Sequence, residues 1–210
     1  MDKQQEHLNT LKEIRSMMER SSRFLSLSGL AGIIAGIIAI AGIAAVYIFF
    51  NISVDGPEYY QYAANGTNNS VFYRFLAVDG ILVLALSLIS AGIITRRKAR
   101  QLGLSSLDTP ARRMLINLFI PLVTGGFYCL VLAYHGMIDF IAPATLIFYG
   151  LALINASKYT LNDIRYLGFL EIIIGLTASV LLQYGLLLWA FGFGILHIIY
   201  GITMYYKYEK

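Results

Sequence analysis

The chain has 210 residues, of which 58% are hydrophobic and only 13% are charged. Soluble domains carry about 25% charged residues, so this composition excludes an ordinary water-soluble domain and favours a protein that lies in lipid. The only cysteine, Cys129, excludes an internal disulfide and argues against a cysteine-based metal site.

Residues 1–23 predict an amphipathic helix ahead of the first apolar stretch. Four apolar residues recur at helical spacing along one stripe: Leu8, Leu11, Ile14 and Met18. We interpret the segment as a cytoplasmic helix on the inner leaflet, or alternatively as a docking helix for a cytoplasmic protein or a second copy of the chain. A cleavable signal peptide is disfavoured, because the lead carries acidic residues and the apolar run after it continues to Phe50.

Six apolar stretches follow, each long enough or nearly so to cross about 30 Å of hydrocarbon at about 1.5 Å per residue. They lie at about 25–50, 72–95, 114–134, 138–156, 167–183 and 186–205. The predicted fold class is therefore all-α, a polytopic membrane protein with six transmembrane helices in a compact bundle. Residues 24–206 form the transmembrane domain, and residues 207–210 form a cytoplasmic tail.

The basic residues predict the orientation of these spans. With six spans, every Lys and Arg except Arg74 falls on one side. Cytoplasmic loops carry an excess of Lys and Arg, so both termini are expected in the cytosol. The expected location is a cell membrane, and a bacterial inner membrane rather than a eukaryotic one.

Small residues predict where helices approach closely, because close backbone contact, not exclusion of water, holds helices together in lipid. In the first span, Gly32 and Gly36 form a GxxxG pair. The pair predicts tight packing of this helix, either within the bundle or between two copies of the chain.

Glycines also mark one face of each of the last two spans. Reflection of the chain about the turn near 184–185 pairs Gly175 with Gly194 and Gly168 with Gly201. We expect these two glycine faces to pack against each other.

An ionisable residue lies in each of these two apolar spans. Glu171 and His197 each lie 13 residues from Tyr184, so an antiparallel hairpin sets them at similar depth. A lone charge in a membrane costs about 2.5–3.5 kcal/mol on insertion scales, so we expect them to pair. The pair is either structural or a proton or ion site; alternatively, Glu171 leans out toward Arg165 near the end of its helix.

A second polar series lies on spans two and three. Its members are Asp79, Asn117, Thr124 and Tyr128. If both faces point inward, these residues would extend a proton or small-ion path. Hydrogen bonds between helices would give the same pattern, and Arg74 would neutralise Asp79 at the outer interface.

No HExxH, GxSxG, P-loop or Rossmann motif occurs, so we expect no enzymatic activity, no cofactor and no metal. The basic loop 96–113 lacks interleaved aromatic residues, which favours lipid headgroups over nucleic acid as its partner. The leading interpretation is a regulatory, sensory or scaffolding membrane protein that acts through residues 1–23 and the basic loop. The alternative is a small proton- or ion-coupled transporter or channel that uses Glu171 and His197.

Overall fold

The computed structural model describes residues 28–51, 70–101, 103 and 109–210, which form helices joined by turns with no strand among them. The expected helix at residues 1–23 lies outside the described residues. The elements in chain order are α2 (Gly29–Phe50), α4 (Ser70–Gln101), α5 (Thr109–Tyr134), η1 (Ile138–Phe140), α6 (Ile141–Ala156), η2 (Ser157–Tyr159), α7 (Asp163–Val180), η3 (Leu182–Tyr184), α8 (Gly185–Trp189), η4 (Ala190–Leu196) and α9 (His197–Tyr208).

Five of the expected spans correspond to stretches of helix that are long and apolar enough to cross a membrane. These stretches are Gly29–Phe50, Val71–Gln101, Thr109–Tyr134, Ile138–Tyr159 and Leu182–Tyr208. The remaining one, expected at 167–183, is α7, which has 18 residues. Its 18 residues include three charged ones, Asp163, Arg165 and Glu171, whereas each of the other stretches contains 18 consecutive residues with at most two.

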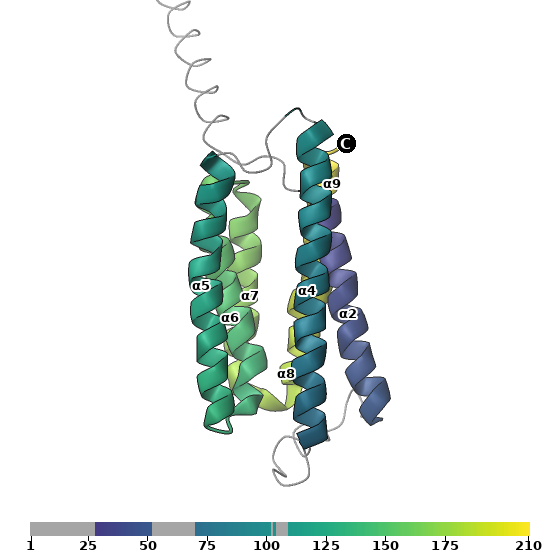
Figure 1. The fold of residues 1–210 in the computed structure, drawn as a ribbon, viewed down its shortest axis with the longest axis vertical. Helices are drawn as coiled ribbons and strands as arrows, with labels where there is room; N and C mark the ends of the chain where they lie inside the picture. Colours follow the sequence, from purple (N-terminus) through teal and green to yellow (C-terminus); the bar gives the residue numbers. More distant parts are fainter. Residues whose placement is uncertain (1–27, 52–69, 102, 104–108) are drawn as a thin grey trace, which may run out of the picture.

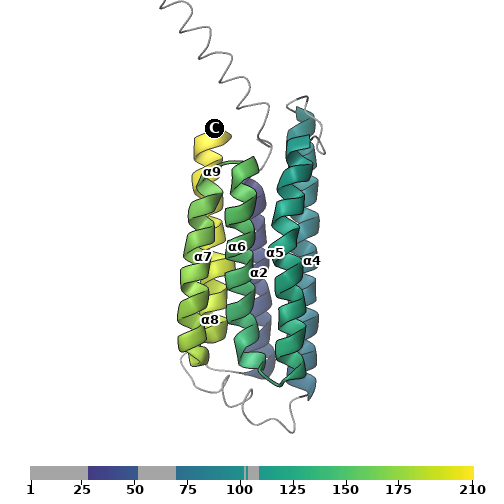
Figure 2. The same cartoon turned by 90° about the vertical axis from the view of Figure 1, so that its left-hand side faces the viewer.

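The helices run antiparallel in two layers (Figures 1 and 2). One layer contains α5, α6 and α7, with α6 packed against both of its neighbours. The other contains α4, α2 and the continuous rod formed by α8, η4 and α9, with α2 in the middle. The layers are joined where α7 packs against α8 and η4 and where α6 packs against α8.

Glycines bring the helices of each layer into close contact. A Cβ atom on Gly201 of α9 would lie 2.6 Å from the carbonyl oxygen of Gly29 in α2. A Cβ atom on Gly150 of α6 would lie 2.5 Å from the carbonyl oxygen of Gly168 in α7. Such distances are far inside van der Waals contact, so only glycine allows these backbones to lie so close.

The predicted packing of the α7 glycines on the α9 glycines is wrong. Gly168 and Gly175 face α6, while Gly194 and Gly201 face α2. The reason is that α7 and α9, although joined by a short turn, belong to different layers. Each glycine face instead meets a helix of its own layer.

The GxxxG pair of the first span also serves this packing. A Cβ atom on Gly32 would lie 3.3 Å from the Cα of Gly201, and one on Gly36 would lie 2.6 Å from the carbonyl oxygen of Gly194. Both glycines of the pair are therefore used inside the bundle.

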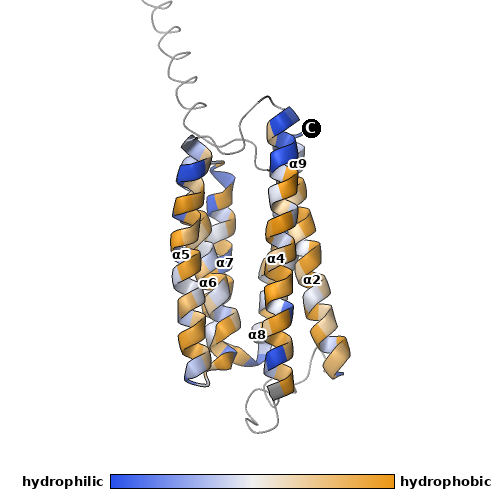
Figure 3. Ribbon diagram, in the orientation of Figure 1, coloured by the Kyte–Doolittle hydropathy of each residue, from blue (hydrophilic) through white to orange (hydrophobic). Residues whose placement is uncertain are grey.

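The outer helices α4 and α5 present large apolar side chains on the surface. Examples are Ile81, Leu84, Phe127 and Leu130, each at least half exposed. Apolar residues cover most of the length of the helices, and polar residues gather where α4 ends and α5 and α7 begin (Figure 3). A surface of this kind is suited to contact with hydrocarbon.

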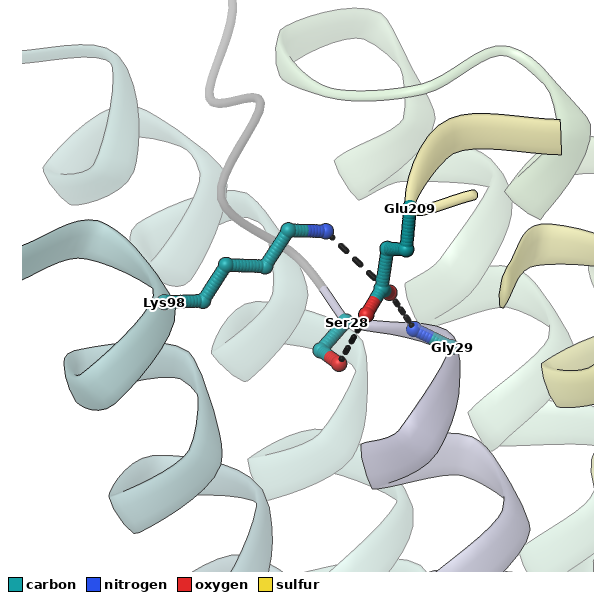
Figure 4. A network of polar contacts seen from close by, with 4 residues as sticks. All are labelled: Ser28, Gly29, Lys98 and Glu209. Atoms are coloured by element: carbon teal, nitrogen blue, oxygen red, sulfur yellow. Dashed lines mark hydrogen bonds and ion pairs between the residues drawn. The ribbon is translucent and has the colours of Figure 1, made fainter. Parts of the chain in front are cut away.

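At the end of α9, Glu209 joins three elements (Figure 4). Its carboxylate accepts hydrogen bonds from the backbone N–H of Gly29 (2.6 Å) and the hydroxyl of Ser28 (3.1 Å). It also pairs with the Nζ of Lys98 at 3.1 Å. Because the first turn of a helix has free N–H groups and a partial positive charge, a carboxylate stabilises it. Glu209 therefore caps α2 and ties it to α4 and α9.

We predict that Gly201→Ala lowers stability by about 1–3 kcal/mol, since the added methyl group meets backbone atoms of α2 that cannot move aside. Gly92→Ala is the matched control, because a methyl group added to Gly92 in α4 would have no neighbour within 4 Å. That change should be neutral or stabilising by up to about 1 kcal/mol. Equal unfolding midpoints for the two variants in detergent would contradict the packing of α2 on α9.

Candidate functional site

Glu171 lies in the middle of α7, and its side chain is completely buried (0% exposed). It is about 12 Å along the helix from Asp163, the first residue of α7. The alternative in which Glu171 leans toward Arg165 is wrong, because α7 begins earlier than expected and Glu171 is two turns inside it. The guanidinium of Arg165 instead lies over the ring of Phe169, 5.4 Å from its centre.

His197, the first residue of α9, lies beside Glu171. Its Nδ1 atom is 3.4 Å from Oε1 of Glu171, and both side chains are buried. The structure thus brings together the two ionisable residues that were expected at one depth because each lies 13 residues from Tyr184.

The hydrogen bonds of His197 fix which nitrogen carries the proton. Nδ1 lies 3.0 Å from the carbonyl oxygen of Gly192, which can only accept, so Nδ1 carries the hydrogen. In a neutral imidazole Nε2 is then an acceptor, and the hydroxyl of Tyr149 donates to it at 2.8 Å. Both ring nitrogens are therefore satisfied in the neutral form.

Glu171 is not satisfied in this way. Neither carboxyl oxygen has a hydrogen-bond partner among the described residues. The 3.4 Å approach to Nδ1 of His197 is within range of an ion pair, but the N–H of that nitrogen is directed to the Gly192 carbonyl. Glu171 is therefore the one member of this group whose hydrogen-bonding capacity is unused.

The walls around the pair are aromatic, apolar or glycine. The ring of Phe193 lies 5.0 Å from that of Tyr149, and the ring of Trp189 lies 4.8 Å from that of Phe193. A Cβ atom on Gly192 would lie 2.6 Å from Oε2 of Glu171, so the carboxyl group fills the space that a side chain at this position would need.

A change of helix type between α8 and α9 positions Gly192 and Phe193 beside Glu171 and His197. Residues Ala190–Leu196 form a π-helix between α8 and α9. The wider turn shifts side chains around the axis relative to an α-helix, and such segments occur frequently at functional sites. The α-helical spacing assumed for this span does not hold before His197.

The second polar series is placed elsewhere. Thr124 and Tyr128 lie on the exposed side of α5, and the hydroxyl of Thr124 donates to the carbonyl of Ile120 in its own helix. Asn117 accepts hydrogen bonds from Asn155 and so joins α5 to α6. The carboxylate of Asp79 lies against Gly42 of α2. The structure does not bring these four residues to Glu171 and His197.

Two neighbours of Glu171 were missed by the sequence reasoning. Tyr149 and Glu171 each lie 11 residues from Thr160, so the reflection applied to the last hairpin would have placed them at one depth across the α6–α7 turn. Gly192 carries no such signal, because its position depends on the π-helix.

We predict that Glu171→Met raises the stability of the protein by about 1–3 kcal/mol, because it replaces a buried polar group that lacks partners with an apolar side chain of similar length. The control is Glu209→Met, which removes a carboxylate with three partners and should lower stability. Unfolding midpoints in detergent measure both. A loss of stability in both variants would show that Glu171 has a structural partner.

Comparisons of the chain with protein-family models, with curated proteins and with solved structures found no match.

Proposed function

We propose that this chain is a membrane protein of six spans that binds and releases a proton at Glu171 and His197, as a small proton-coupled carrier or channel. The observation that supports it most is the fully buried carboxyl group of Glu171, which has no hydrogen-bond partner among the described residues. An unsatisfied buried polar group costs about 1–3 kcal/mol, so a structural role alone would favour an apolar residue. Ionisable residues inside membrane spans mark proton and ion routes.

In the proposed topology α7 also crosses the membrane, as the fifth of the six spans, although it carries three ionisable residues. Glu171 faces the protein interior, while Asp163 and Arg165 lie in its first turn, at the boundary of the apolar layer. Among the described residues, every Lys and Arg except Arg74 lies toward the end of the bundle where α4 ends and α5 begins. This end is proposed to face the cytosol of a cell, in a bacterial inner membrane, with both termini on that side.

A proton fits the site better than a metal cation. Calcium and magnesium take six or more oxygen ligands. Near Glu171, the carbonyl of Gly192 and the hydroxyl of Tyr149 are already hydrogen-bonded to His197. No three His, Cys, Asp or Glu residues gather into a metal site in the part of the chain that the structure describes.

The site also lies where a change of charge would act on the whole bundle. Glu171 belongs to one layer and His197 to the other, and the π-helix η4 before His197 packs against both α7 and α2. An ionised Glu171 attracts a protonated His197, whereas a neutral carboxyl group does not. Gain or loss of a proton therefore changes the force between the layers, which is the kind of bias that shifts a protein between two arrangements.

We predict that the protein reconstituted in liposomes conducts or exchanges protons, detected with an enclosed pH-sensitive dye, and that Glu171→Gln abolishes this flux. The amide has the size of the carboxyl group but takes up no proton in this pH range. Asp79→Asn is the control, since Asp79 lies on α4 against α2 and should leave the flux unchanged. Folded wild-type protein without proton flux would overturn the carrier proposal.

A regulatory or scaffolding role through residues 1–23 is a second candidate, supported by the Glu209 cluster. Ser28 and Gly29, where the N-terminal segment enters α2, are held by the carboxylate of Glu209 at the basic end of the bundle. A partner bound to residues 1–23 would thus act on a helix end that is fixed in position.

We predict that a photocrosslinking residue at Leu11, on the apolar stripe of residues 1–23, captures one discrete cytoplasmic protein or a second copy of the chain in intact cells. The same residue at Glu13, on the charged face, should not. Adducts to lipid alone at Leu11 would exclude this second candidate.

A further inference from the structure

We propose that Asp163, Lys207 and Tyr208 form a clasp that closes the basic end of the bundle over Glu171 and His197, and that release of this clasp gives water access to the two residues. The inference rests on the proposed function, because it concerns how the proton site is reached from the cytosol.

The clasp joins the two layers at the end of the bundle where the basic residues gather. Oδ2 of Asp163, in the first turn of α7, accepts hydrogen bonds from the Nζ of Lys207 (2.8 Å) and from the hydroxyl of Tyr208 (2.7 Å). Both donors lie in the last turn of α9. One carboxylate thus holds the start of α7 to the end of α9.

Among the described residues, the main packing of helix on helix between the layers lies farther from this end. It is formed by α7 on α8 and η4 and by α6 on α8, and both of these segments precede α9 in the rod. α9 itself packs closely on α2, in its own layer. The basic end is therefore held across the layers by side chains, which can part without unfolding a helix, and the packing around α8 and η4 provides a hinge.

A buried apolar cluster lies between the clasp and the proton site. On α7, Ile164 and Leu167 lie between Asp163 and the site. On α9, Met204 lies between the site and Lys207. These three apolar side chains belong to one cluster, and each is at most 4% exposed. An aqueous path between α7 and α9 therefore opens when the two helices part around this cluster.

The contacts of the clasp are suited to break and re-form. The side chain of Lys207 is 53% exposed and that of Asp163 is 26% exposed, and Tyr208 is also exposed. Water and salt compete for such groups, so contacts between them are weak. The neighbouring ion pair of Glu209 with Lys98 is more shielded, with side chains 14% and 15% exposed. Release is therefore expected at Asp163, while Glu209 keeps the end of α9 on α2 (Figure 4).

The clasp and the proton site lie on the same two helices. Asp163 and Glu171 both belong to α7, and His197 and Lys207 both belong to α9. A movement that parts the clasp also acts on the distance between the two groups of the site. A change of charge at the site in turn biases the clasp toward its open or its closed arrangement.

The test measures how fast a thiol in the apolar cluster reacts with a small water-soluble maleimide, in the full chain held in lipid nanodiscs. Cys129→Ala removes the native cysteine, and Leu167→Cys supplies the thiol, about one turn from the carboxyl group of the site. The double change Lys207→Met and Tyr208→Phe removes both donors of the clasp and leaves α7 unaltered. We expect it to speed the labelling by roughly tenfold, because the rate follows the population of the open state and two weak contacts restrain that opening.

The matched control is Lys210→Met with Tyr206→Phe, the same two kinds of change at the same end of the chain. The Nζ of Lys210 lies over the ring of Tyr206, 5.2 Å from its centre, and both residues are exposed. This variant should label at the rate of its parent. A thiol at Leu186→Cys, buried in α8, tests for general loosening, and its rate should be the same with and without the clasp.

Unchanged labelling of Leu167→Cys in folded protein that lacks both donors would overturn the clasp. An equal increase at Leu186→Cys would also overturn it, since the change would then loosen the whole bundle. If Leu167→Cys does not fold, Leu153→Cys on α6 supplies the thiol from the same cluster.

A reversible lock separates the clasp from the proton site. Asp163→Cys and Lys207→Cys are joined by a cleavable bifunctional thiol reagent in the Cys129→Ala protein. We expect the linked protein to show a proton flux in liposomes that is lower by roughly tenfold or more, and cleavage of the linker to restore it, because a closed gate limits access to the site. Undiminished flux in the fully linked protein would overturn the gate and leave the proton site intact. A wild-type protein without flux would overturn the proposed function, and the labelling rates would still decide whether the clasp closes this end.

Discussion

Close approach of helix backbones at glycine is the constraint on which this structure depends. In an apolar surrounding, side chains gain little by leaving the solvent, so packing and hydrogen bonds must hold the helices together. Two pairs meet this demand, α2 with α9 and α6 with α7, and each has glycine against backbone. The pairs define the two layers, and they carry all three groups of the candidate site: Glu171 on α7, Tyr149 on α6 and His197 on α9.

Glu171 and Glu209 show how the same side chain serves two purposes. Glu209 lies at a helix N-terminus and has a backbone N–H, a hydroxyl and an ammonium group as partners, so its charge is fully used to hold the bundle together. Glu171 lies among aromatic rings and glycine, and its neighbour His197 directs its hydrogen bonds elsewhere. A carboxyl group held in place by packing, with its oxygens uncommitted, is suited to change its protonation state.

The sequence predicts where the helices lie along the chain better than it predicts which helices pack against one another. Long apolar runs specify the spans because lipid thickness sets their length, and reflection about a short turn places His197 beside Glu171. The same reflection fails for the glycines of α7 and α9, because a glycine face can pack on any other smooth face and the chain pattern does not say which. The π-helix, and with it the contact of Gly192 with Glu171, depends on tertiary packing that no local pattern encodes.

The Glu209 cluster has a consequence for the order in which the molecule is made. On the ribosome α2 is the first of the described helices to emerge, yet the carboxylate that caps it belongs to a residue synthesised after α9. Its packing partner α9 is equally late. During translation α2 and α4 must therefore remain without their partner α9 while four further segments are synthesised. The first turn of α2 receives its cap only once Glu209 has been made. Assembly of this layer is thus a late, long-range event, in contrast to the α6–α7 hairpin, which can close as soon as its two arms exist.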